Sequence, residues 1–240
     1  MSRVAIVAAL EREVRPLVKR WRVTEKEYVG RRFRFFEKDD VVLVCGGIGA
    51  EAARRAAEAV ISLYAPALVY SAGFAGALDH ALKVGTVVQP ARVVNSGDGS
   101  SVSLGQGAGV LVSFGAVASS AQKAKLRASF GAQAVDMEAA AVARAAEARG
   151  VGFAVLKVIS DEFDFTLPDM DRFVDSDGRF LESRFAVFAA IRPWIWPQVV
   201  RLARNSKRAS RVLCEWLESV NIAQVSSSSN TSAIEAAHRR

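Results

Sequence analysis

The stretch that decides the fold runs from Val135 to Asp161 and reads VDMEAAAVARAAEARGVGFAVLKVISD. Its first part is rich in alanine and predicts a helix opened by Glu138, and its second part is an apolar run that ends at Asp161. An apolar run of this length between helices is typical of a strand buried on both faces of a sheet. Because ligands collect at the carboxyl ends of strands in α/β sheets, an acid at this place is a candidate for chemistry.

Strand and helix patterns alternate on both sides of this stretch, with a Gly- and Ser-rich loop expected over 95–109. The alternation predicts an α/β fold with three layers, α/β/α, around a central mixed twisted sheet. We expect strands at 3–9, 28–37, 40–45, 67–71, 86–94 and 110–113, and helices at 11–19, 50–64 and 119–130.

Two glycine-rich segments follow predicted strands, at 46–49 (GGIG) and 73–76 (GFAG). Glycine lets the backbone approach a ligand closely, but tight turns alone are an equally good interpretation. Neither segment has the spacing of a P-loop or of a dinucleotide-binding fingerprint.

The chain divides into three expected parts: a main domain over 1–190, a basic amphipathic helical segment over 191–222, and a disordered tail over 223–240. The net charge of +7 is concentrated in the second part, because six basic residues and no acid lie between Arg192 and Arg211. No nucleic-acid-binding module accompanies this charge, so we expect no nucleic-acid partner.

Composition predicts a cytoplasmic protein. Charged residues interrupt the apolar N-terminus, which argues against a signal peptide, and no apolar run has the length of a membrane span. Cys45 and Cys214 lie in apolar runs without metal or redox spacing, so we expect buried thiols, no metal and no cofactor.

Three acids are candidates for catalysis, and each has a structural alternative. Glu13 has the sequence context of an exposed helix charge, and Glu138 suits the dipole of the first helical turn. For Asp161 a purely structural role is the least convincing, because the sequence shows no obvious basic partner for it. Capping of the next turn is the structural alternative. No Ser/His/Asp or Cys/His set is present, which disfavours covalent acyl chemistry.

The order of short motifs over residues 1–175 resembles the purine nucleoside phosphorylase and nucleosidase superfamily, especially its methylthioadenosine/S-adenosylhomocysteine nucleosidase branch. Residues 1–190 are therefore expected to form a nucleosidase-like domain. The motifs that carry the resemblance are AIVAALEREV (5–14), GGIG (46–49), SAGFAGAL (71–78), LKVG (82–85), VDME (135–138) and ISD (159–161).

This resemblance implies cleavage of a purine N-ribosidic bond with release of adenine. Asp161, next to Ser160, would deliver a proton to N7 of the purine, and desolvation at the strand end would help it keep that proton near neutral pH. Glu138 would accept hydrogen bonds from the ribose hydroxyls, with Met137 packed on the sugar. Glu13 would position and deprotonate water.

Two departures from the superfamily pattern favour water over phosphate as the nucleophile. Phosphorylases carry a Gly-Asp-x-x-Arg loop where this chain has ALERE at 9–13, and Phe74, after Gly73, replaces a small hydroxyl residue. Arg12 and Arg15 keep phosphate open as the alternative.

The purine pocket also departs from the nucleosidases, which carry Gly-Asp-x-Phe before the Met-Glu motif. The comparable segment here is SFGAV at 113–117. Either Phe114 stacks on the purine from a shifted position, with Val117 nearby, or the base pocket differs.

The C-terminal block resembles that of hopanoid-associated phosphorylase-like proteins, a group linked to removal of adenine from the lipid nucleoside adenosylhopane. A basic amphipathic helix near tryptophans suits the inner membrane surface, whereas packing on the core is the alternative. The competing functions are a soluble methylthioadenosine/S-adenosylhomocysteine nucleosidase and a non-catalytic nucleoside-binding protein. The resemblance also implies a homo-oligomer.

Overall fold

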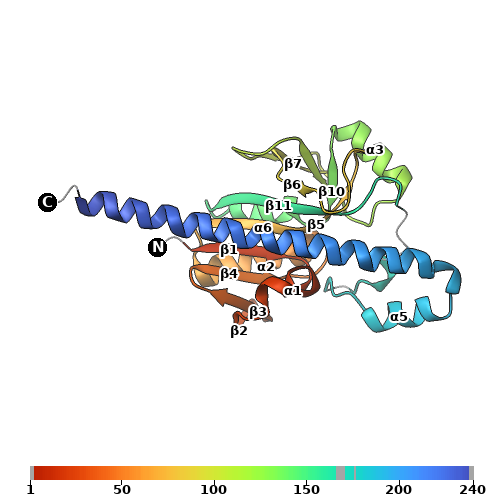
Figure 1. The fold of residues 1–240 in the computed structure, drawn as a ribbon, viewed down its shortest axis with the longest axis horizontal. Coiled ribbons are helices and arrows are strands. Elements are labelled where there is room, and N and C mark those ends of the chain that lie inside the picture. Colours follow the sequence, from red (N-terminus) through yellow and green to blue (C-terminus); the bar gives the residue numbers. More distant parts are fainter. Residues whose placement is uncertain (1–2, 166–170, 176, 238–240) are drawn as a thin grey trace.

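A mixed sheet of eleven strands lies between two layers of helices (Figure 1). The computed structural model describes residues 3–165, 171–175 and 177–237. The expected three-layer α/β/α fold is confirmed. The strands are β1 (Val4–Ala8), β2 (Arg22–Tyr28), β3 (Arg31–Lys38), β4 (Val41–Cys45), β5 (Leu68–Ala77), β6 (Val87–Val88), β7 (Arg92–Asn95), β8 (Ser101–Ser103), β9 (Val110–Ser113), β10 (Ala134–Asp136) and β11 (Gly152–Asp161).

Side chains of successive strand residues point to opposite faces, so each face of the sheet has its own core. In β1, Ala5 and Val7 pack with helices α2 (Ala50–Tyr64) and α4 (Ala139–Glu147), whereas Ile6 and Ala8 pack with helices α1 (Glu11–Val18) and α6 (Trp196–Ala237). The other helices are α3 (Ser120–Phe130) and α5 (Glu182–Ala190).

Strand β5 organises the site because it pairs with three neighbours. It runs parallel to β1 and β11, and its last residues turn to pair antiparallel with β10. Residues 73–76, expected as a loop, belong to this strand. Gly76 lies in register with both Val135 and Asp161. A glycine suits this position in the strand because a side chain would collide with these two residues.

Three other expected elements are divided differently. The strand predicted over 28–37 is the second half of a hairpin, with a turn at Val29 and Gly30, both of which have positive φ. The strand predicted over 86–94 is interrupted near Pro90, since proline cannot donate a ladder hydrogen bond. The predicted loop over 95–109 contains β8.

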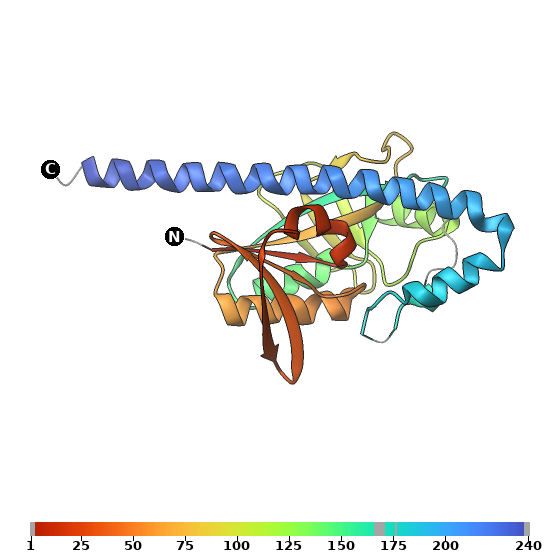
Figure 2. The ribbon, with the colours of Figure 1, turned by 60° about the horizontal axis from the view of Figure 1, so that its bottom comes forward.

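Helix α6 crosses the face of the sheet beside α1 and β11, and its C-terminal end extends past the sheet in both views (Figures 1 and 2). Its buried face includes Ala209, Leu213 and Leu217. The helix continues to Ala237, beyond the tail boundary expected at 223, and no glycine or proline after Pro197 interrupts it. Residues 238–240 of that tail lie outside the described residues. No helix in the described ranges is both long and apolar enough to span a membrane.

Candidate active site

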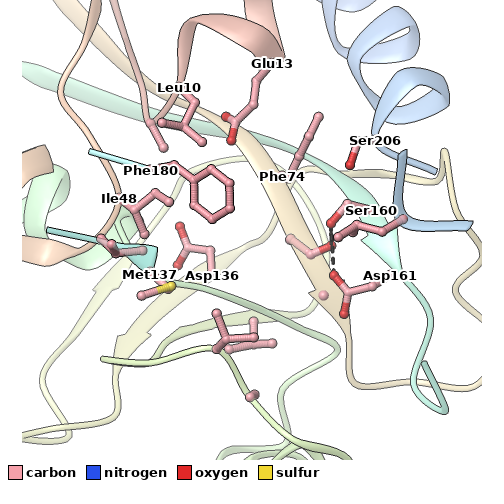
Figure 3. Close-up of a pocket in the computed structure, with 18 of the residues that line it drawn as sticks. Leu10, Glu13, Ile48, Phe74, Asp136, Met137, Ser160, Asp161, Phe180 and Ser206 are labelled. Carbon is pink, nitrogen blue, oxygen red and sulfur yellow. Dashed lines mark hydrogen bonds between the residues drawn. The ribbon is translucent and has the colours of Figure 1, made fainter. Parts of the chain in front are cut away.

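A cavity of about 430 Å³ lies where β1, β5, β10 and β11 end (Figure 3). The carboxyl ends of strands are the usual ligand site of such sheets, and the volume is typical of a small-molecule pocket. Beyond the strand ends, its walls come from the start of α1, the segment before α3, the segment around α5, and α6.

Seven of the nine residues expected from the sequence line this cavity, and two do not. The seven are Glu13, Phe74, Val117, Met137, Glu138, Ser160 and Asp161. Gly73 lies directly behind Glu13, because a Cβ atom there would approach Oε2 of Glu13 to 2.8 Å. Phe114 packs against a small core that includes Leu78 and Val112, so it does not line the cavity.

Glu13 is buried at the start of α1 instead of lying on an exposed helix face. Burial, together with the nearby charge of Glu138, raises its pKa to about 8. Its Oε2 atom has no hydrogen-bond partner among the described residues. A carboxylate with this pKa can accept a proton near neutral pH.

Glu138 is held by the backbone at the start of α4. The N–H of Gly49 donates to its Oε1 at 2.9 Å, and the N–H of Met137 donates to Oε2 at 3.2 Å. Burial raises the pKa of Glu138, while the ammonium of Lys157, 3.8 Å away, opposes this effect. Its oxygens are fixed against the cavity wall, where they can accept further hydrogen bonds.

Asp136 and Lys157 form a buried ion pair behind Glu138, at 2.8 Å. Burial lowers the pKa of Lys157, but the carboxylates of Asp136 and Glu138 outweigh burial, and the net effect is a raised pKa. We did not expect this pair from the sequence. The available signal was a single lysine in the middle of the apolar strand β11.

Asp161 has a basic partner, which the sequence did not indicate. The ammonium of Lys123, from the first turn of α3, lies 2.5 Å from Oδ2 of Asp161. On the other side, the Ser160 hydroxyl donates to Oδ1 at 2.9 Å (Figure 3). The sequence context of Lys123, between Gln122 and Lys125, is that of an ordinary exposed helix face and does not indicate a buried lysine.

The outer part of the cavity is apolar and comes from segments that the sequence analysis did not assign to the site. Phe180 points into the cavity from the segment before α5 (Figure 3), and the guanidinium of Arg12 lies 4.8 Å from the centre of its ring. The apolar side chains of this wall are Val174, Phe180, Phe185, Val199 and Leu202.

Within the described residues, no cluster of three or more His, Cys, Asp or Glu side chains is arranged to hold a metal ion. The ionisable side chains that line the cavity include Glu13, Asp136, Glu138, Asp161 and Lys123.

A family model decides the relationship of the chain to known proteins. The model of the phosphorylase superfamily matches residues 3–116 and 108–191.

The chain belongs to the phosphorylase superfamily.

Similar proteins of the superfamily include nucleosidases. A curated 5′-methylthioadenosine/S-adenosylhomocysteine nucleosidase of Marinomonas sp. (strain MWYL1) is 34% identical over 103 residues, which span 40% of this chain and 42% of the relative. A nucleosidase of the same name from Colwellia psychrerythraea 34H, solved in complex with adenine, is 26% identical, with 67% of this chain and 83% of that chain covered and a TM-score of 0.59.

The chain also shares its fold with a protein that has a different name and activity. The futalosine hydrolase of Helicobacter pylori strain 26695 has a TM-score of 0.67 at 18% identity, with 91% of this chain and 96% of that chain covered. At this identity the likeness concerns the fold alone.

Proposed function

We propose that this protein is a nucleosidase that hydrolyses the N-ribosidic bond of an adenosyl compound and releases adenine. The observation that carries the proposal is the convergence of Glu13, Glu138 and Asp161 on one cavity. The two nucleosidases described above, one of them holding adenine, support the same reaction class.

The proposed reaction breaks the bond between C1′ of the ribose and N9 of the purine. The departing base needs a proton at N7, and Asp161 delivers it as the general acid. Glu138 accepts hydrogen bonds from the ribose hydroxyls with oxygens already fixed by Gly49 and Met137. This anchoring holds the sugar while positive charge develops at C1′.

Water is the proposed nucleophile, with Glu13 as the base. Three carboxylates, of Glu13, Asp136 and Glu138, lie at this end of the cavity with two cations, Lys157 and Arg12. When Glu13 is ionised, as its role as the base requires, this set has an excess of negative charge, which disfavours a phosphate anion. Phosphate as a co-substrate remains the alternative, for which Arg12 is the available cation.

The decisive experiment measures adenine released by the purified protein, with and without added phosphate. We expect turnover in phosphate-free buffer, and a loss of about 10²–10⁴-fold in Asp161→Asn. A requirement for phosphate, with a ribose 1-phosphate product, would overturn the role of Glu13. If wild type and Asp161→Asn bind the nucleoside but are both inactive, the protein is a binding relative.

We further propose that the group on the ribose 5′ carbon is a large apolar one, as in adenosylhopane. The apolar outer wall, with Phe180 and Leu202, favours such a group over a charged amino-acid chain. Methylthioadenosine and S-adenosylhomocysteine are the competing substrates. Adenine release from methylthioadenosine but not from adenosylhopane would establish the soluble nucleosidase instead.

A lipid substrate requires access from a membrane, and the surface beside the cavity suits one. Trp194 and Trp196 are 72% and 53% exposed, and Arg201 and Arg204 lie on the next turns of α6. The indole N–H of Trp196 donates to the carbonyl of Ala189 at 2.9 Å, which fixes the exposed ring in place. Exposed tryptophans beside arginines favour the interface of an anionic membrane.

The proposal includes a homo-oligomer, as the superfamily resemblance implies. Light scattering on the purified protein tests this point, and a monomer at micromolar concentration would remove it from the proposal.

A further inference from the structure

Lys123 and Asp161 form a buried ion pair inside the cavity. Their side chains are 1% and 7% exposed, and both residues line the cavity wall. Besides Oδ2 of Asp161 at 2.5 Å, the ammonium reaches the carbonyl oxygen of Glu162 at 2.8 Å. A lysine buried to this degree needs a specific role or strong compensation, because desolvation of its charge is costly.

The local structure fixes the position of this lysine. Helix α3 begins at a capping box, in which Ser119 and Gln122 each satisfy the backbone N–H of the other. Lys123 follows directly, so its stem leaves a well-defined turn and points into the cavity rather than into solvent. On the neighbouring strand β5, the absence of a side chain at Gly76 leaves room for Oδ2 of Asp161.

Charged groups on the surrounding elements have other partners. Arg127, one turn further along α3, pairs with Asp79 at 3.3 Å. The carboxylate of Glu162 faces Lys83 at 3.9 Å and Arg201 of α6 at 3.8 Å. Among the described residues, Asp161 is therefore the carboxylate that compensates Lys123.

This geometry changes how a proton reaches the leaving group. The general acid must have a proton to give, and Oδ2 of Asp161 lies in hydrogen-bond contact with the ammonium of Lys123. The nearest proton is on Nζ of Lys123. Resting on the proposed function, we propose that Lys123 acts through Asp161 as the proton source for departure of the purine.

The proposed step is balanced. As the C1′–N9 bond breaks, its electron pair moves into the purine, N7 takes a proton from Asp161, and Asp161 takes one from the ammonium of Lys123. Lys123 ends as a neutral amine, Asp161 is again a carboxylate, and solvent returns a proton to Lys123 after the base leaves. Because Lys123 lies in hydrogen-bond contact with Asp161, it can reload the general acid in every turnover.

The test compares two leaving groups on the same 5′-substituted ribose: adenine, which needs a proton, and 4-nitrophenolate, which does not. In Lys123→Met we expect kcat/KM for the adenine compound to fall about 100-fold or more. We expect the nitrophenyl compound to change by less than threefold, and the alkaline limb of the adenine pH profile to move to lower pH. Lys123→Arg keeps the positive charge but does not release its proton, so it should lose adenine release much as Lys123→Met does; a profile like that of wild type would show that the charge alone suffices and would overturn the proposal.

Equal losses with both leaving groups, or an unchanged pH profile in Lys123→Met, would overturn the proposal. Cleavage of the nitrophenyl compound also reports that the variant is folded. If Lys123→Met does not fold, Lys123→Gln, which keeps a hydrogen-bond donor, takes its place with the same expected results. Failure of the proposed function looks different, because wild type would then cleave neither compound.

Discussion

The ammonium of Lys157 lies 2.8 Å from the carboxylate of Asp136, and the two side chains are only 2% and 0% exposed. Asp136 is also the acceptor for the hydroxyl of Ser113 at 2.6 Å and for the N–H of Ala139 at 2.8 Å. The pair therefore joins β10, β11 and the start of α4 at the floor of the cavity, directly behind Glu138.

Removing the cation of this pair should destabilise the protein. Lys157→Met leaves the buried carboxylates of Asp136 and Glu138 without their compensating charge, which costs about 3–5 kcal/mol. Urea unfolding measures the loss, with Lys125→Met, at an exposed site on α3, as the control expected to change stability by less than about 0.5 kcal/mol. Similar midpoints for the two variants would contradict this account.

Glu13 links activity and stability to pH. With a folded-state pKa of about 8 against an ordinary value of 4.5, its side chain takes up a proton on folding between these two values. Stability from Glu13 is therefore fully present at low pH and is lost as pH rises to about 8. We expect kcat/KM to rise over the same range, because the ionised form is the base.

Glu13→Gln removes the titrating group, so it should abolish most activity while gaining stability relative to wild type by several kcal/mol between pH 5 and pH 9. Thermal unfolding at both values provides the measurement. Glu11→Gln, two residues earlier on α1 at a partly exposed site, should follow wild type. A constant difference between Glu13→Gln and wild type across this range would refute the raised pKa.

Space at Gly76 should be essential for the position of Asp161. A Cβ atom there would lie 2.8 Å from Oδ2 of Asp161 and 3.3 Å from Val135, so Gly76→Ala must displace the carboxylate. We expect at least a tenfold loss of adenine release. Gly115→Ala, which meets no atom within 4 Å, is the matched control and should keep its activity. Equal activity of the two variants would show that Asp161 tolerates displacement.

Membrane association should depend on the exposed tryptophans. Trp194→Ser with Trp196→Ser should reduce co-sedimentation with phosphatidylglycerol vesicles at least fivefold, and wild type should bind phosphatidylcholine vesicles weakly. Val23→Ser, at a 48% exposed site on β2, removes apolar surface elsewhere and should leave binding unchanged. Binding that is insensitive to the tryptophans would remove this surface from the proposal.

Most of the architecture could be predicted from periodicity, because buried strands and amphipathic helices have distinct repeats. The exceptions have local physical reasons. Glycines at 73–76 suggested a loop, but they lie in a strand where Glu13 and Asp161 approach the backbone. The helix α6 extends further than its apolar pattern indicated, and its run without glycine or proline was the available signal.

The carboxylates of the site could be predicted from the sequence, whereas the lysines that pair with them could not. Glu138 and Asp161 stand at the ends of regular elements, which gives them a visible context. Lys123 reaches Asp161 across 38 positions of sequence through a tertiary contact, and nothing in its own helix distinguishes it from a solvated lysine. The roles proposed for Glu13, Glu138 and Asp161 remain predictions for the experiments above.

Because α6 forms part of the cavity wall, the proposed catalytic residues and the outer wall of the cavity come from different parts of the sequence. The proposed catalytic residues precede residue 165 in the sequence, whereas much of the apolar outer wall of the cavity comes from Val174 onward. Homologues can therefore differ in substrate preference through changes in the C-terminal part of the chain, while the proposed catalytic residues stay the same. Chimeras that exchange this end between relatives offer a direct route to nucleosidases with new preferences.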